Sequence, residues 1–167
     1  MPKLGVPNIT FIGIDPGASG GIAWQRGNVV SAIKMPTTMK DLWDFFYDEF
    51  DSASAPCNGE CHCIIEKVQG FVGKAQPGSA AFTFGKGYGS LLMALTGNQI
   101  PYQEVPPRNW QKALGVPPKK KEESKTQWKN RLKAVAQARF PKVPVTLNIA
   151  DALLIMLYGQ LQYGRKL

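Results

Sequence analysis

A buried strand that runs directly into a carboxylate constrains the fold of this chain more than any other feature. The apolar run at residues 9–14 leads into Asp15, and Pro16 and Gly17 follow at once. This pattern predicts a strand that ends in a tight turn, with Asp15 held where the strand stops. An acid at such a position is costly unless water, a cation or a metal satisfies it.

Two further acids lie at comparable positions far along the chain. Glu66 closes the short β-branched run at residues 63–65, and Asp151 lies near the start of an apolar helix, whose dipole favours a negative side chain there. Singly, Asp15 could cap a turn, Glu66 could pair with Lys67, and Asp151 could neutralise a helix end. Taken together, the three positions predict that the acids converge at one sheet edge. A cluster of oxygen ligands suits Mg²⁺ or Mn²⁺ and not zinc.

Hydrophobic periodicity and turn residues predict an α/β fold with a mixed five-stranded sheet. The expected strands cover residues 9–14, 22–25, 29–33, 63–65 and 100–105. The expected helices cover residues 38–50, 78–96, 106–114, 122–140 and 149–162. The order predicts that the first three strands are antiparallel and that later strands are added through helical crossovers. This is the ribonuclease H-like arrangement, flanked by helices.

Length and charge narrow the class of partner. The 167 residues are enough for one globular domain, 1–167, in which residues 1–8 are expected to be a flexible N-terminal tail. The net charge is +8, and residues 101–167 hold 13 Lys and Arg against 4 Asp and Glu. This asymmetry favours a polyanion such as nucleic acid, although a solvated basic surface is the simpler alternative.

The chain has no uninterrupted apolar run of about 18 residues and no apolar signal segment at its start. We therefore expect a soluble protein without a membrane partner. The expected location is the cytoplasm, either associated with the nucleoid or in the host cytoplasm if the gene is viral, and an organelle is also possible.

Three cysteines flank the only histidine, in the order Cys57, Cys61, His62, Cys63. The group invites a zinc interpretation, but Cys61 and Cys63 would share one strand face while His62 points to the other. Four ligands on so short a segment do not readily form a tetrahedron. The odd number of cysteines favours a reducing compartment and free thiols.

Three glycines interrupt the predicted helix at 78–96. Each of Gly85, Gly87 and Gly89 weakens a helix by up to about 1 kcal/mol relative to Ala. We expect close helix packing, against a second subunit, to compensate for this loss. Close approach of the helix backbone to DNA is the alternative.

Five segments in this order resemble the RuvC-like Holliday junction resolvases, including their phage and organellar branch. They span nearly the whole chain, and their ordered combination is more specific than any one of them. The segments are Gly13-Ile14-Asp15-Pro16-Gly17, Ile64-Ile65-Glu66-Lys67-Val68, Gly85-Lys86-Gly87-Tyr88-Gly89, Pro107-Arg108-Asn109-Trp110-Gln111-Lys112 and Ala150-Asp151-Ala152-Leu153-Leu154.

The resemblance implies a structure-selective endonuclease acting in DNA recombination and repair. Such an enzyme is a homodimer that grips a four-way DNA junction and makes paired, metal-dependent cuts, without a nucleotide cofactor. Two Mg²⁺ or Mn²⁺ ions per site would be held by Asp15, Glu66 and Asp151. Lys125 resembles a lysine placed near the scissile phosphate, where a cation offsets developing charge.

The resemblance and the charge pattern also indicate DNA contacts. Phe71 lies in a loop that can present an aromatic wedge to the junction centre, although a core-facing Phe71 is nearly as plausible. The basic residues and the loop neighbours of Phe71 are expected to contact phosphates without reading sequence. The predicted DNA-binding residues are Gln69, Phe71, Lys74, Lys112, Lys119, Lys120, Lys121 and Lys129.

Asn148 departs from the family pattern. The family usually supplies a fourth acidic or histidine ligand three residues before Asp151, and this chain has an amide there. An amide oxygen can coordinate a metal, but it brings no negative charge. Either the site works with three acids, helped by Thr146 or water, or Asn148 replaces an Asp and the protein with this sequence is impaired.

Three other functions fit parts of the pattern. A junction-binding protein without catalysis would keep the fold and the basic surface. A ribonuclease H acting on RNA:DNA hybrids would use the same acids. A phosphotransferase of the actin and sugar-kinase type is disfavoured, because it needs a second domain and a second glycine-rich phosphate loop.

Overall fold

The computed structural model describes residues 9–51, 61–68 and 78–164 of the chain. The predicted tail at 1–8 and Cys57 lie outside the described residues. Within them, ten elements follow one another in the order expected from the sequence, with one additional short turn of π-helix.

The sheet has five strands in the order β3-β2-β1-β4-β5. These are β1 (Thr10–Asp15), β2 (Gly21–Arg26), β3 (Val29–Lys34), β4 (Cys61–Glu66) and β5 (Tyr102–Val105). The first three strands are antiparallel, whereas β1 pairs with β4, and β4 with β5, in parallel. The tight turn between β2 and β3 requires a positive φ of 54° at Gly27, which glycine adopts without strain. The mixed sheet confirms the predicted fold class.

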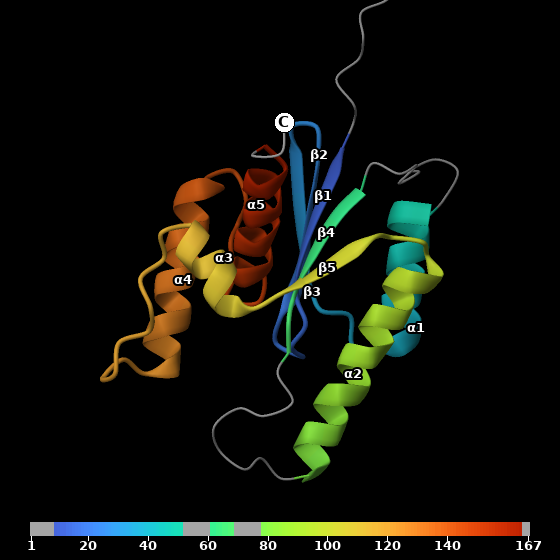
Figure 1. Ribbon diagram of the computed structural model, residues 1–167, viewed down its shortest axis with the longest axis horizontal. Coiled ribbons are helices and arrows are strands. Elements are labelled where there is room, and N and C mark those ends of the chain that lie inside the picture. Colours follow the sequence, from blue (N-terminus) through green and yellow to red (C-terminus); the bar gives the residue numbers. More distant parts are fainter. Residues whose placement is uncertain (1–8, 52–60, 69–77, 165–167) are drawn as a thin grey trace, which may run out of the picture.

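Helices cover both faces of the sheet (Figure 1). Helices α1 (Met39–Phe46) and α2 (Gly78–Gly97) lie on one face. Helices α3 (Pro107–Ala113), α4 (Lys125–Arg139) and α5 (Ala150–Gly164) lie on the other. Because consecutive strand residues point to opposite faces, strands β1 to β4 each contribute to two separate cores.

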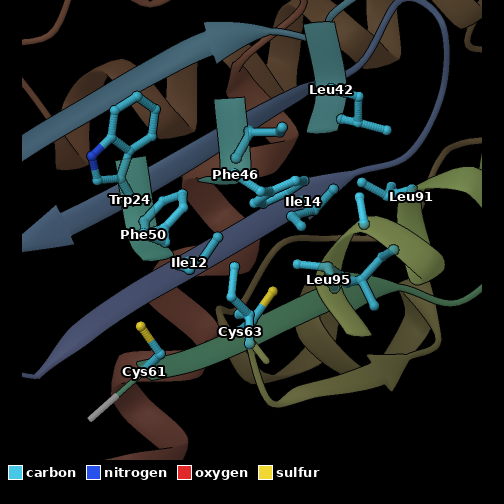
Figure 2. Close-up of a cluster of buried hydrophobic side chains, with 14 of the residues drawn as sticks. Ile12, Ile14, Trp24, Leu42, Phe46, Phe50, Cys61, Cys63, Leu91 and Leu95 are labelled. Carbon is cyan, nitrogen blue, oxygen red and sulfur yellow. The ribbon is translucent and has the colours of Figure 1, made fainter. Parts of the chain in front are cut away.

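The core on the α1/α2 face is apolar throughout. Ile12 and Ile14 of β1 and Cys63 of β4 pack there against Phe46 and Leu95 (Figure 2). The opposite core is built by the alternate residues of the sheet. It includes Ala23, Ile64, Val105, Trp110, Leu132 and Leu153. The alternation therefore leaves Asp15, next after Ile14, and Glu66, next after Ile65, on the α3–α5 face.

Two helices differ from their predicted bounds by three residues or more, for local reasons. The predicted helix at 38–50 ends as an α-helix at Phe46 and continues as a π-helical turn over Tyr47–Asp51. Helix α4 starts at Lys125 and not at 122, because Ser124 caps it. The Ser124 side chain accepts from the Gln127 backbone N–H, and the Gln127 side chain accepts from the Ser124 N–H, which completes a capping box.

The two described cysteines follow the predicted strand alternation, but only one of them is the free thiol that the sequence predicted. Cys61 and Cys63 are buried and His62 between them is exposed, as expected for a strand. Cys63 is a free thiol, and burial raises its pKa above the ordinary range. Cys61, however, is disulfide-bonded, so the prediction of free thiols is wrong for this residue.

No helix within the described ranges combines the length and the hydropathy needed to cross a lipid bilayer.

Candidate active site

Asp15 and Glu66 end neighbouring parallel strands. In the register of β1 and β4, Ile14 lies beside Ile65, so the next residues along the two strands are the two acids. Parallel strands end at the same edge of a sheet, and the side-chain alternation turns both acids to the same face. The predicted position of these acids, each at a strand end, is confirmed.

Helix α5 brings Asp151 to this edge because Gly13 lets the helix backbone rest on β1. A Cβ at Gly13 would lie 2.2 Å from the Met156 backbone N and 2.3 Å from the Ala152 O. No other residue type fits this contact. Asp151 is the second residue of α5 and is only 5% exposed, which places its carboxylate near the positive end of the helix dipole.

The three acids influence one another through their charges. Burial raises the pKa of Asp15, and repulsion from Asp151 adds to this rise. Burial, followed by repulsion from Asp15, raises the pKa of Glu66 to about 7. Like charges held close together in a poorly solvated site favour a cation or a proton. The arrangement is therefore an anionic site that attracts cations.

Lys129, from the second turn of α4, points into the acids. Its Nζ lies 2.5 Å from Asp151 Oδ2 and 3.6 Å from Asp15 Oδ2. Burial alone would lower the pKa of Lys129, but the charges of Asp151, Asp15 and Glu66 together raise it, so the group stays protonated. The sequence predicts Lys129 only as a DNA contact, and its position among the acids could not be foreseen from helical periodicity.

Trp110 orients Glu66. The indole Nε1 of Trp110, a residue of α3, donates a hydrogen bond of 2.9 Å to Glu66 Oε2, and the ring is fully buried. This bond favours the charged form of Glu66 and partly opposes the effect of burial on its pKa. Trp110 falls within one of the five matching segments, but nothing in its local sequence pattern predicts a role in the site.

Asn148 lies next to the turn that follows β1. Its Nδ2 donates a hydrogen bond of 2.9 Å to the backbone O of Ser19. Close packing extends around this turn, since a Cβ at Gly21 would lie 2.8 Å from the Asn148 O and one at Gly20 would lie 2.2 Å from the Asp15 O. The amide at Asn148 thus ties the start of α5 to the loop beside Asp15.

The three carboxylates are chemically suited to a divalent cation that prefers oxygen ligands, although their spacing in the described structure does not form a metal site. Asp151 Oδ1 is buried and has no hydrogen-bond partner, although a buried carboxylate oxygen normally has one. A cation bound there would satisfy this atom and relieve the repulsion between Asp15 and Asp151. In the described ranges, no three Asp, Glu, His or Cys side chains are spaced to hold a metal ion, and Lys129 lies between two of the acids.

The other predicted basic residues surround the site without entering it. Lys125 is exposed at the first position of α4, and Lys112 is exposed in the last turn of α3. Lys119, Lys120 and Lys121 are exposed in the loop between these helices. Gln69, Phe71 and Lys74 lie outside the described residues.

Arg131 holds that loop against α4. Its guanidinium donates to both Glu123 carboxylate oxygens, at 3.0 and 2.7 Å, and to the backbone O atoms of Pro117 and Pro118, each at 3.1 Å. It also stacks on the Trp128 ring, 4.5 Å from the ring centroid. The planar fork of Arg suits this role, which the charge count alone could not reveal.

Comparison with known proteins identifies the fold. A solved structure of Thermus thermophilus RuvC matches with a TM-score of 0.56 and 15% identity, over 95% of this chain and 96% of that chain. A structure of T. thermophilus RuvC in complex with Holliday junction substrate matches with the same values. No protein-family model and no curated protein matches the chain. The chain therefore has a RuvC-like, ribonuclease H-like fold.

Proposed function

We propose that this protein is a structure-selective endonuclease that resolves four-way DNA junctions by paired hydrolysis of phosphodiester bonds. The observation that carries the proposal is the convergence of Asp15, Glu66 and Asp151, from β1, β4 and α5, on one edge of a RuvC-like fold. The similar structure with a Holliday junction bound supports branched DNA as the substrate class.

The acids have separate tasks in this mechanism. Asp15 interacts electrostatically with both other acids, and it would hold metal together with Asp151 and Glu66. When bound, two Mg²⁺ or Mn²⁺ ions supply an activated water and stabilise the leaving oxygen. Trp110 keeps one Glu66 oxygen in place by hydrogen bonding, which limits the orientations available to that carboxylate.

The basic elements beside the acids would bind the DNA backbone. Lys125 lies one helical turn before Lys129 on α4, so the side chain of Lys125 can reach a phosphate near the acid site. Lys112 and the loop at residues 119–121 extend this cationic surface along α3 and α4. Contacts of this kind position a duplex arm without reading its sequence.

We infer that α2 forms a homodimer interface. Phe82, Gly85, Gly89 and Met93 recur at helical spacing and share one stripe of α2. Phe82 is 73% exposed and Met93 is 61% exposed, and a Cβ added at Gly85 or Gly89 would meet nothing within 4 Å. The glycines leave space for a second helix to approach closely, and a two-fold dimer would match the symmetry of paired cuts.

Replacing both Phe82 and Met93 by Ser tests this interface. The double variant should be monomeric in sedimentation equilibrium at concentrations where the wild-type protein is dimeric. It should nick junctions on one strand without pairing the cuts. Leu161→Ser, at an exposed apolar position on α5, is the control and should leave the dimer intact.

The function itself is tested with a four-way junction, a linear duplex of matched sequence and an RNA:DNA hybrid, each with Mg²⁺ or with EDTA. We expect paired, Mg²⁺-dependent nicks on the junction alone. Preferential cutting of the hybrid would replace the proposal with a ribonuclease H function.

An Asn148→Asp variant in the same assay decides the role of the amide. Cutting by the protein with Asn148 would show that three acids and Asn148 suffice. Tight junction binding without cutting, rescued by Asn148→Asp, would show that one charge is missing. Binding without rescue would favour a junction-binding protein, which the engagement of Asn148 with Ser19 also permits.

A further inference from the structure

Lys129 and a divalent cation would bind the same carboxylate oxygens. The ammonium group of Lys129 contacts Oδ2 of Asp151 at 2.5 Å and lies 3.6 Å from Oδ2 of Asp15. These are two of the three acids that would hold the cation. A positive charge so close to shared ligands repels a divalent ion, and at this distance in a partly buried site the repulsion is weakly screened.

Lys129 differs from a fixed structural ion pair in one respect. Its side chain is 30% exposed, while those of Asp15 and Asp151 are 13% and 8% exposed. The acids are held by β1 and by the second position of α5, but the ammonium group ends a flexible four-carbon stem that reaches from the protein surface. The lysine can therefore move out to solvent, whereas the carboxylates cannot.

We propose that Lys129 is an exchangeable internal cation, which competes with divalent metal for Asp15 and Asp151 until a phosphate of the DNA substrate draws it away. The inference rests on the proposed function, because the phosphate belongs to the bound junction. Withdrawal of Lys129 frees Oδ2 of Asp151 beside the unpartnered Oδ1 of the same carboxylate.

Exchange of this kind couples metal binding to substrate binding. The phosphate offers the ammonium group a second anionic partner, so DNA lowers the cost of removing Lys129 from the acids. By linkage, junction DNA then tightens metal binding by the same factor by which the metal tightens DNA binding. Metal ions would load chiefly on the protein that already holds its substrate.

Calorimetric titration of the full chain with Ca²⁺, without DNA and at fixed ionic strength, tests the competition. Lys129→Met should bind Ca²⁺ at least about tenfold more tightly than the wild-type protein, because a repelling charge is removed. Lys129→Arg, which keeps the charge, should stay within about threefold of wild type. Lys133→Met, one helical turn further along α4, is the matched control for net charge and should also stay close to wild type.

Two results of this titration would overturn the proposal. One is unchanged or weaker Ca²⁺ binding by Lys129→Met, which would mean that the lysine supports the acids as ligands. The other is absence of Ca²⁺ binding to every variant. If Lys129→Met does not fold, as judged by circular dichroism, Lys129→Gln, which also removes the charge, takes its place.

The coupling is tested by repeating the titration on the protein saturated with four-way junction. Junction DNA should tighten Ca²⁺ binding more in the wild-type protein than in Lys129→Met, and an equal effect in both contradicts the release by phosphate. Junction binding in EDTA, followed by fluorescence anisotropy, separates the two levels of inference. If the protein does not bind the junction in EDTA, the proposed function is refuted. The titration without DNA would still show whether Lys129 competes with the cation.

Discussion

The two faces of the sheet are built from the same strands but carry different chemistry. Toward α1 and α2, β1 and β4 present Ile12, Ile14, Cys63 and Ile65, and that core is apolar throughout. Toward α3, α4 and α5, the same strands present Gly13, Asp15, Ile64 and Glu66. The first face can be packed by any well-fitting apolar residues, whereas the second must also hold buried charges, which tolerate far less change. The difference suggests that stability and chemistry are divided between the faces.

Asp151→Asn provides the largest expected effect and tests this division directly. The change preserves side-chain shape but removes a ligand charge, so junction cleavage should fall by about three orders of magnitude, the size expected when metal stabilisation of several kcal/mol is lost. Junction binding in EDTA should persist. Leu95→Met, in the α1/α2 core, should change stability by less than about 1.5 kcal/mol and leave cleavage unaltered. Comparable losses of cleavage in both variants would contradict the division of stability and chemistry between the two faces.

Gly13→Ala should be the most damaging small substitution on the α3–α5 face. The new Cβ would overlap the Met156 N and the Ala152 O of α5, so the helix must shift and carry Asp151 away from Asp15. We expect a loss of about 3 kcal/mol or more in the free energy of unfolding, measured by urea denaturation, together with loss of cleavage.

Gly87→Ala is the matched control on the α1/α2 side. A Cβ at Gly87 would meet nothing within 4 Å, and removal of a helical glycine should stabilise the protein by up to about 1 kcal/mol. Similar destabilisation by both changes would show that the close approach of α5 to β1 is not the reason why position 13 requires glycine.

The pH dependence of stability should come from the acid face. Burial and the charge of Asp15 raise the pKa of Glu66 from 4.5 to about 7 in the folded protein. Protonated Glu66 thus favours folding below pH 4.5, and this contribution is lost as the pH rises through about 7, at a cost of up to about 3 kcal/mol.

Glu66→Gln should remove much of that slope in EDTA and exceed the wild-type protein in stability at pH 8. Denaturation midpoints at several pH values between 4 and 8 measure the effect. A wild-type slope retained in full by Glu66→Gln would assign the dependence to another group, of which Asp15, whose pKa is also raised, is the first to test.

Arg131→Gln should have the smallest effect on function, because Arg131 lies on the α3–α5 side but does not contact the three site acids. Loss of the bonds to Glu123, Pro117 and Pro118 frees the loop that carries Lys119, Lys120 and Lys121. Junction affinity should fall by about threefold to tenfold, and the salt dependence of binding should weaken by about one phosphate contact.

Arg139→Gln, on the exposed last turn of α4, removes the same charge without touching the loop. An equal loss of affinity in Arg139→Gln would mean that Arg131 acts only through its charge. Cleavage by the bound complex should be unaltered in both variants, because neither residue contacts the acids.

Most of the predicted elements are confirmed, and the differences have local causes. Helix α4 begins three residues late because Ser124 and Gln127 satisfy each other's backbone groups, which helical periodicity does not register. The prediction for Cys61 is wrong because a count of cysteines says nothing about the distance between two sulfurs. The assignments of Gln69, Phe71 and Lys74 remain predictions.

The strand ends at Asp15 and Glu66, the helix start near Asp151 and the basic segment before it could all be predicted, because they depend on local periodicity, turn residues and composition. Three contacts depend on the packing of the folded chain: Lys129 with Asp151, Trp110 with Glu66, and Asn148 with Ser19. Each of these contacts joins elements that are far apart in the chain. These contacts form only if the helices approach the sheet closely. That distance is set by Gly13 and by the packed core, and the residues next to each contact in the sequence do not determine it.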